Sequence, residues 1–208
     1  MNAVVNRMTP TITTMIRMDH SHALALFHRY KADTPVGRKR ALIANACLAL
    51  EIHAQLEEEI FYPALRTVLT GDETLQKSEP EHNEMRRLIV ELRDRMSAEG
   101  PLDATVDDKF MDLMRTVIHH VADEETRLLP AAERLLGDQL ARLGGEMTRR
   151  RIELLRPHAG EIAATTVRSF PAGAAAGAAL LTAGAVALGA MLFSRSKRTG
   201  QSGRGARW

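Results

Sequence analysis

The chain has 208 residues, of which 45% are hydrophobic and 26% charged, proportions that are ordinary for a soluble globular protein. Its single cysteine, Cys47, excludes an internal disulfide framework and fits a reducing compartment. The net charge of +2 is unevenly distributed: residues 1–150 carry 20 Lys and Arg against 24 Asp and Glu (net −4), and residues 151–208 carry 8 against 2 (net +6). The basic excess therefore lies in the C-terminal part and does not favour nucleic-acid binding by the main domain.

The low aromatic content of 4% and the many Ala, Leu, Arg, Glu and Met residues favour helices, and no stretch alternates as a strand would. The first predicted helix runs from Thr11 to about Lys31. Its apolar face consists of Ile12, Met15, Ile16, Leu24 and Phe27. A second helix begins after Pro35 and continues to about Leu69, where Gly71 ends it. Cys47 lies in an apolar run of this helix and is expected to be a buried small hydrophobic residue.

A third helix covers residues 81–96, and its start stays open towards Asp72 because Pro80 would kink it. After a break at 99–101, a fourth helix runs from Asp103 to about Leu136. Its apolar stripe consists of Phe110, Leu113, Met114, Val117, Ile118 and Val121. A fifth, arginine-rich helix follows from Asp138 to about Leu155. Short connections predict an all-α fold, an antiparallel up-down four-helix bundle with an additional C-terminal helix and an Ala/Gly-rich apolar tail.

Two segments repeat the same motif, H-x-x-x-E followed six residues later by proline. The first is His53 to Glu57 with Pro63, and the second is His120 to Glu124 with Pro130. Residues four apart lie on the same face of a helix, so each segment presents an imidazole beside a carboxylate. Metal sites in helix bundles are built from such pairs.

Helix spacing indicates that the motifs reach the same depth. His82 lies about 16 residues before the break at 99–101, and His120 about 17 residues after the start of the fourth helix. At about 1.5 Å per residue, both lie roughly 25 Å from the same end of the bundle. His20 and His53 show a looser match around the preceding connection. Four helices can therefore each deliver a ligand to a common level.

The repeat includes a further pair, Asp19-His20 and Glu81-His82, each upstream of an H-x-x-x-E helix. The order His, H-x-x-x-E, His, H-x-x-x-E indicates duplication of a two-helix unit. Its two halves would supply four histidines and two carboxylates to a pair of metal ions. Imidazole and carboxylate ligands without a thiolate suit iron or manganese better than structural zinc. The predicted ligands are His20, His53, Glu57, His82, His120 and Glu124.

This six-residue pattern resembles the hemerythrin-like (HHE cation-binding) family, as do the continuations EEEIFYP at 57–63 and DEETRLLP at 123–130. The resemblance covers about residues 11–136. It implies a four-helix bundle that holds two non-haem iron ions with oxo or hydroxo bridging and O2, peroxide or nitric oxide chemistry. The invertebrate oxygen carriers have an additional histidine, so this chain is more similar to the bacterial and regulatory members. Reversible oxygen transport is therefore not the expected function.

Several neighbours compete for these roles. His22 could replace His20, and His119 could replace His120, although the register of Pro130 favours His120. The acidic residues beside the motifs are predicted to form a solvated face, with the option that one of them orients a ligand; they are Glu58, Glu59 and Glu125. For Asp19 and Glu81 an orienting role and a surface role stay open. Tyr62 is expected to pack in the core rather than line the site, and His28 to lie on the surface.

The predicted domains are a bundle at 11–136, a basic helical extension at 137–168, a membrane-associated segment at 171–193 and a basic disordered tail at 194–208. Residues 171–193 carry no charge and are long enough to cross a hydrocarbon layer of about 30 Å. Their Ala and Gly content leaves a flexible linker as the alternative. Residues 1–14 lack a long apolar stretch, so no secretory signal is expected. We expect a cytoplasmic main domain that this segment could anchor to a membrane.

We therefore expect a non-haem di-iron protein, with manganese as an alternative, that binds or reduces O2, peroxide or nitric oxide. Consumption of peroxide or nitric oxide would make it an enzyme. The main alternative is an iron- or oxygen-sensing regulatory module without turnover, and a metal-free helical interaction domain is a third. No nucleic-acid partner is predicted, and the sequence specifies neither an oligomeric state nor a separate catalytic acid or base.

Overall fold

The structure is a computed structural model that describes residues 10–97, 102, 104–160 and 162. Within these residues every regular element is helical, and no strand is present. The elements are α2 (Ile12–Arg29), α3 (Val36–Leu56), η1 (Glu57–Phe61), α4 (Tyr62–Arg66), α5 (Glu73–Ser97), α6 (Ala104–Asp123), η2 (Glu124–Leu128), α7 (Leu129–Leu136), α8 (Gln139–Leu155) and η3 (Arg156–His158).

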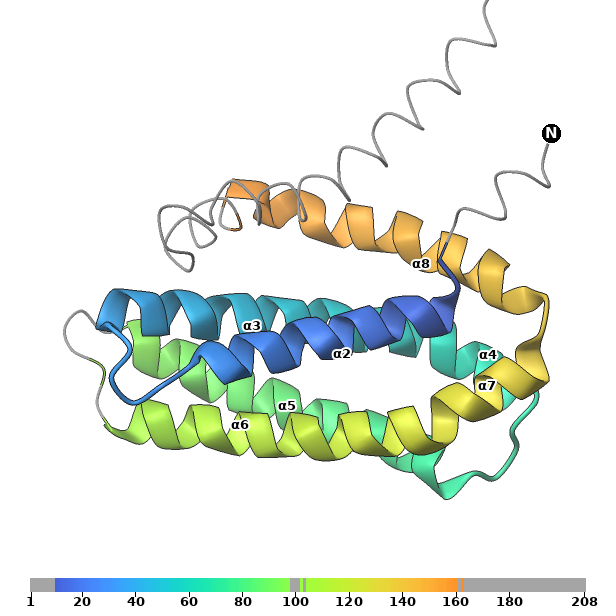
Figure 1. Cartoon of the computed structure of the whole chain (residues 1–208), viewed down its shortest axis with the longest axis horizontal. Helices are drawn as coiled ribbons and strands as arrows, with labels where there is room; N and C mark the ends of the chain where they lie inside the picture. Colours follow the sequence, from blue (N-terminus) through green and yellow to red (C-terminus); the bar gives the residue numbers. More distant parts are fainter. Residues whose placement is uncertain (1–9, 98–101, 103, 161, 163–208) are drawn as a thin grey trace, which may run out of the picture.

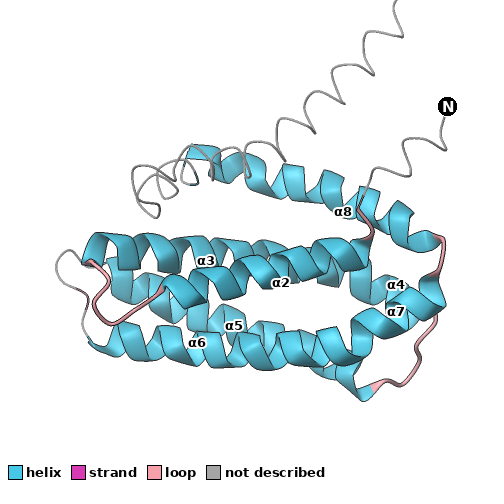
Figure 2. Ribbon diagram, in the orientation of Figure 1, coloured by secondary structure: helices cyan, strands magenta, loops and turns pink. Residues whose placement is uncertain are grey.

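Helices α2, α3, α5 and α6 form an antiparallel up-down bundle in which each helix packs against the next (Figures 1 and 2). The all-α bundle with a fifth helix is therefore confirmed. Helix α3 continues through η1 into α4, and α6 continues through η2 into α7, so each of these two bundle helices bends near one end of the molecule.

The helix ends follow local signals in the sequence. Thr11 caps α2, since its hydroxyl accepts a hydrogen bond of 3.2 Å from the backbone N–H of Thr14. Asp72 caps α5 in the same way, with 2.9 Å from its carboxylate to the N–H of Leu75. Helix α5 therefore begins at Glu73, the earlier of the two starts, and includes Pro80. Both Pro80 and Gln76, whose carbonyl loses its hydrogen bond to the proline, are exposed, so water can satisfy that group.

Three details of the prediction are wrong. The second helix ends at Arg66 rather than near Leu69, and Gly71, with φ of +74°, lies in the turn before α5. Leu24 and Ile118, expected on apolar faces, are 38% and 49% exposed. Each lies one position away from the inward-facing row of its helix, where Ala23 of α2 and Val117 of α6 are buried instead.

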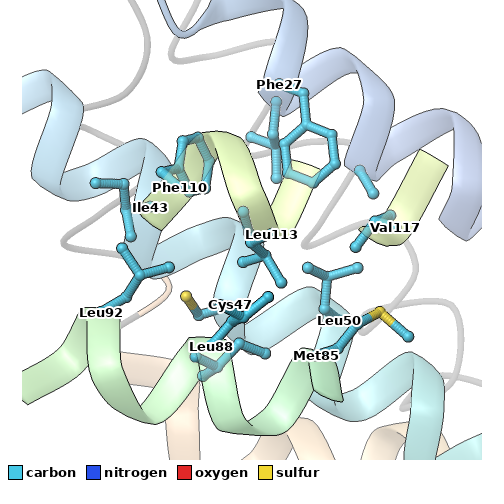
Figure 3. Close-up of a cluster of buried hydrophobic side chains, with 14 of the residues drawn as sticks. Phe27, Ile43, Cys47, Leu50, Met85, Leu88, Leu92, Phe110, Leu113 and Val117 are labelled. Atoms are coloured by element: carbon cyan, nitrogen blue, oxygen red, sulfur yellow. The ribbon is translucent and has the colours of Figure 1, made fainter. Parts of the chain in front are cut away.

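Two apolar clusters fill the bundle at different depths. The first joins the C-terminal half of α2, the N-terminal half of α3, the C-terminal half of α5 and α6, and it contains Phe27, Cys47, Leu88 and Phe110 (Figure 3). The second joins the opposite ends of α2, α3 and α5 with η1, α4, η2, α7 and α8. Along α2, α3 and α5, the predicted ligand histidine lies between residues of the first and second cluster, and His120 lies at the end of α6, before Leu128 of the second cluster in η2. The apolar layers therefore enclose a polar layer.

Helix α8 lies outside the bundle against α2 and α3 (Figure 1). It buries Leu143 and Met147, and its Gly144 lies against the backbone of residues 10–12. A Cβ atom on Gly144 would lie 2.1 Å from the carbonyl oxygen of Pro10, whereas a Cβ on Gly145 would meet nothing within 4 Å. The glycine at 144 is thus required for α8 to pack where it does.

Within the described ranges, no helix combines the length and apolar content needed to cross a bilayer. The predicted membrane-associated segment 171–193 and the basic tail 194–208 lie outside these ranges, so both stay predictions.

Replacing Gly144 by Ala should move α8 away from α2. We expect the free energy of unfolding to fall by about 1–3 kcal/mol, the usual effect of forcing extra atoms into a packed contact. The matched variant Gly145→Ala should instead be neutral or stabilising by up to about 1 kcal/mol, because alanine favours a helix over glycine. Urea unfolding of both variants measures the difference, and equal stabilities would contradict the packing of α8 described above.

Candidate metal centre

All six predicted ligand residues meet in the polar layer. They form two overlapping groups of potential ligand atoms, and within each group the atoms lie within 4.8 Å of one another. The first group is His53, Glu57, His82 and His120, and the second is His20, His53, Glu57 and Glu124. His53 and Glu57 belong to both groups, which therefore lie side by side. Each group satisfies the proximity that a metal ion requires, and their role as ligands stays a prediction.

The two glutamates lie between the imidazoles. One Glu57 oxygen is 3.2 Å from Nε2 of His53 and 3.4 Å from Nε2 of His82. One Glu124 oxygen is 3.1 Å from Nε2 of His20 and 3.6 Å from Nε2 of His120. All six residues are buried, and the most accessible of them, His53, is only 5% exposed. The carboxylates can thus contact imidazoles from several helices, as bridging ligands would.

Each glutamate begins a π-helical turn. The N–H of Tyr62 bonds to the carbonyl of Glu57, and the N–H of Leu129 bonds to the carbonyl of Glu124, five residues back in both cases. Pro63 and Pro130 follow directly, and neither has an N–H with which to continue an α-helical pattern. Such single π turns are frequent at functional sites. The repeated proline in the sequence is the signal for these turns.

Four outer carboxylates face the Nδ1 atoms of the four histidines. The distances are 2.8 Å from His20 to Glu125, 2.9 Å from His82 to Glu58, 2.8 Å from His120 to Glu81 and 3.6 Å from His53 to Asp19. The first three are hydrogen bonds and the fourth is too long to be one. Carboxylates in this position hold the ring so that Nε2 points to the metal.

The contacts of the acidic residues beside the motifs differ in part from the predicted solvated face. Glu58 and Glu125 do not belong to a solvated acidic face, since each accepts a hydrogen bond from a buried histidine of another helix. Glu59 does lie on the surface, where it pairs with Arg150. Asp19 and Glu81, for which two roles were open, both face histidines of the site. The repeat of Asp19-His20 as Glu81-His82 was the available signal.

Three buried polar atoms of the layer lack hydrogen-bond partners: Nδ1 and Nε2 of His53, and Oε1 of Glu57. Buried polar groups in folded proteins are nearly always paired, so these atoms fit a site that a cation completes. The donors are nitrogen and oxygen, which suits iron or manganese. Cys47 adds no thiolate, because it is buried in the first apolar cluster, where burial raises the pKa of its thiol to about 12.

The surroundings of the site raise the pKa values of three histidines, His20, His82 and His120. Burial lowers the pKa of His120, but contacts with the carboxylates of Glu57, Glu81 and Glu124 outweigh that effect and raise the pKa to about 10. The pKa values of His20 and His82 are raised for the same kind of reason. Burial would raise the pKa of Glu57, but the charge of His53 and the contacts with His82 and His120 hold this pKa well below its usual range. Imidazolium and carboxylate groups therefore neutralise one another.

Tyr62 lines the site, although core packing was the expected role. Its hydroxyl donates a hydrogen bond of 2.9 Å to Glu124 and lies 3.2 Å from Glu57 and 3.3 Å from Nε2 of His82. Burial and the charges of the two glutamates raise its pKa well above the usual value, so the phenol stays protonated. Leu129 occupies the corresponding position after Glu124, so the second half of the repeat has no such hydroxyl.

The competing histidines lie outside this constellation. His22 and His119 are exposed, while His20 and His120 are 2% and 1% exposed and point into the layer. His28 is exposed as expected. The spacing to Pro130, which matches that from His53 to Pro63, therefore correctly favoured His120 over His119 as the histidine that faces the other predicted ligands.

A four-helix bundle with one buried histidine on each helix and two buried glutamates, Glu57 and Glu124, defines a helical cation-binding domain. Residues 11–132 match the hemerythrin HHE cation-binding domain, and the chain belongs to that family. A relative from Nostoc sp. (strain PCC 7120 / SAG 25.82 / UTEX 2576), a protein named DNA nickase, is 28% identical over 128 residues. That match covers 62% of this chain and 35% of the relative, so the chain spans about a third of that protein's length. No solved structure matches the chain.

Cation affinity should depend on pH. With its pKa at about 10, His120 is protonated at neutral pH in the metal-free protein, and a cation must displace this proton. We expect the affinity for Mn²⁺ to rise between about pH 6 and pH 9, with proton release on binding. Calorimetric titration in buffers of different ionisation enthalpy measures both quantities, and an affinity independent of pH would contradict the assignment.

The stability of the metal-free protein should show the opposite trend. A histidine whose folded pKa is raised stabilises the fold fully below the unfolded value of about 6.5, and this contribution is lost as the pH rises through the folded value. For His120 the loss extends to about pH 10. Denaturant unfolding of the apoprotein should therefore show decreasing stability from neutral pH to pH 10, and a constant stability over that range would contradict the raised pKa.

Proposed function

We propose that this protein binds two non-haem iron ions in the polar layer and uses them to bind or reduce small oxidants, namely O2, peroxide or nitric oxide. The observation that carries the proposal is the pair of overlapping ligand groups, which share His53 and Glu57 and contain only imidazole and carboxylate donors. Manganese suits the same donors. Iron, when bound, would supply the electrons and the open positions that such oxidants require.

The burial of the site supports a small ligand. The six ligand residues are at most 5% exposed, and apolar clusters lie above and below them. A substrate the size of a metabolite could reach the site only if the helices separated, whereas a molecule of two to four atoms can enter when side chains move. The apolar surroundings also exclude bulk water from any reactive oxygen species held there.

The chain's own groups would orient the ligands and hold a proton. Glu58, Glu81 and Glu125 accept hydrogen bonds from Nδ1 atoms, which leaves Nε2 of those imidazoles free for a cation. Tyr62 holds a neutral hydroxyl against Glu57 and Glu124. Reduction of peroxide consumes protons as well as electrons, and this hydroxyl is the neutral proton-bearing group placed beside both glutamates.

Adjacent histidines allow a matched test of the site. His120→Ala removes a buried ligand, while His119→Ala removes the exposed neighbour. We expect wild type and His119→Ala to bind two iron ions per chain with oxo-bridge absorption, and His120→Ala to bind at least 100-fold more weakly, beyond the roughly 10–100-fold effect of losing an outer partner. Metal analysis after anaerobic Fe²⁺ loading measures this. Wild-type protein that stays substoichiometric in iron would refute the proposal.

Tyr62→Phe tests the role of the hydroxyl while keeping the ring. We expect unchanged iron content and peroxide consumption slower by roughly 100-fold, the lower end of what a positioned proton donor contributes. Stopped-flow measurement of peroxide loss from the reduced, iron-loaded variant gives the rate. The control Tyr30→Phe removes the other tyrosine hydroxyl. Tyr30 belongs to the first apolar cluster, and its hydroxyl donates a hydrogen bond to Asp107. Equal rates for all three proteins would exclude Tyr62 as the donor.

An iron- or oxygen-sensing module without turnover is the second candidate. It is favoured by the buried atoms of His53 and Glu57 that lack partners, because a fold with such atoms gains stability when a cation binds. Binding at 100 times the dissociation constant would add about 2.7 kcal/mol to the free energy of unfolding. A large thermal shift on iron loading without peroxide or nitric oxide turnover would favour the sensor, and turnover would favour the enzyme.

A further inference from the structure

Arginines hold three of the four outer carboxylates. Arg17 donates to Glu125 at 3.1 Å, and Arg86 donates to Glu58 at 2.6 Å. Arg151 donates to both oxygens of Asp19, each at 2.5 Å. Among these, Arg17 and Arg86 belong to the bundle helices, whereas Arg151 belongs to α8, outside the residues that match the family.

The Arg151–Asp19 pair is also the most enclosed of the three. The Arg151 side chain is 25% exposed and that of Asp19 is 16% exposed, compared with 36% for Arg17 and 37% for Arg86. Burial would raise the pKa of Asp19, but its contacts with His53 and Arg151 hold that pKa below the usual value. Bidentate arginine–carboxylate pairs fix geometry as well as charge.

The Arg151–Asp19 pair lies beside His53. Both Asp19 oxygens accept hydrogen bonds from Arg151, and the carboxylate lies 3.6 Å from Nδ1 of His53, beyond hydrogen-bond distance. The other three ligand histidines have a carboxylate at 2.8–2.9 Å. His53 is therefore the ligand histidine whose outer partner is positioned by a helix that does not belong to the bundle, and it is shared by both ligand groups.

We propose that Arg151 is a positioning residue through which α8 controls the metal site: by holding Asp19, it sets the orientation of His53 and hence the cation affinity of both ligand groups. This inference rests on the proposed cation-binding function. Coupling between two equilibria is reciprocal, so cation binding must also stabilise the packing of α8 against the bundle. The packing of segment 139–155 would thereby depend on whether the metal site holds a cation.

Arg151→Gln is the direct test, and Arg150→Gln is the matched control. Arg150 is the preceding residue of α8 and pairs with Glu59, which does not contact a ligand histidine. We expect Mn²⁺ to bind about tenfold more weakly to Arg151→Gln, the lower end of the effect of losing an outer partner, and unchanged to Arg150→Gln. Asp19→Asn should match Arg151→Gln, and the double variant should be no weaker than either single one, because the two residues act as one unit.

Two further measurements separate positioning from general destabilisation. In Co²⁺-loaded protein, exchangeable ¹H resonances report each Nδ1–H of a bound imidazole, and Arg151→Gln should shift or lose one of them while Arg150→Gln keeps all. Hydrogen exchange should show that Mn²⁺ protects the backbone amides of 139–155 in wild type and in Arg150→Gln but not in Arg151→Gln. Equal or tighter Mn²⁺ binding by Arg151→Gln, or equal protection of α8 in all variants, would overturn the inference and leave the cation site intact. Wild-type protein that binds neither Mn²⁺ nor Co²⁺ would overturn both proposals.

Discussion

The structure depends on the burial of one layer of imidazole and carboxylate side chains between two apolar clusters. Taking ionised groups out of water costs several kcal/mol each unless they are paired. Here each of the four histidines has a carboxylate oxygen within 3.6 Å of both ring nitrogens, while both ring nitrogens of His53 and one oxygen of Glu57 have no hydrogen-bond partner. Since the partners come from different helices, the layer forms only if all four helices are in register. The apolar clusters on either side enforce that register, and a bound cation would supply the missing partner.

The π turns explain how one short motif serves both the inner and the outer shell. In each half, the first glutamate of the H-x-x-x-E-E sequence points inward, as Glu57 and Glu124 do. The second, Glu58 or Glu125, bonds to the Nδ1 atom of a histidine on another helix. The wider turn that begins at the first glutamate accommodates the following proline. The repeated unit is thus longer than the four-residue spacing, and it links each helix to its neighbour.

The six inner residues could be predicted because helical periodicity and equal distances from helix ends place them on one face and at one depth. For the outer carboxylates the sequence left an orienting role open, and for Tyr62 it favoured core packing, since their contacts depend on how each helix is rotated about its axis against the next. The start of α5 was ambiguous because Pro80 lowers helix propensity while Asp72 provides a cap, and the cap prevails where the proline is exposed. The pairing of Arg151 with Asp19 joins residues 132 positions apart, and no local pattern encodes it.

The departures from the internal repeat are as informative as the repeat itself. Tyr62 has its counterpart in Leu129, so a hydroxyl contacts the two glutamates from one half alone. Asp19 is held by Arg151, while its counterpart Glu81 has His119 and Asp123 as neighbours. If two cations bind as proposed, they would therefore differ in surroundings despite nearly identical ligand types. One side of the pair would carry the proton-bearing hydroxyl, and an oxidant reduced there would meet electrons and a proton at the same place. Two identical halves would give the oxidant no preferred orientation. The difference between the halves would therefore decide which end of the oxidant receives the proton.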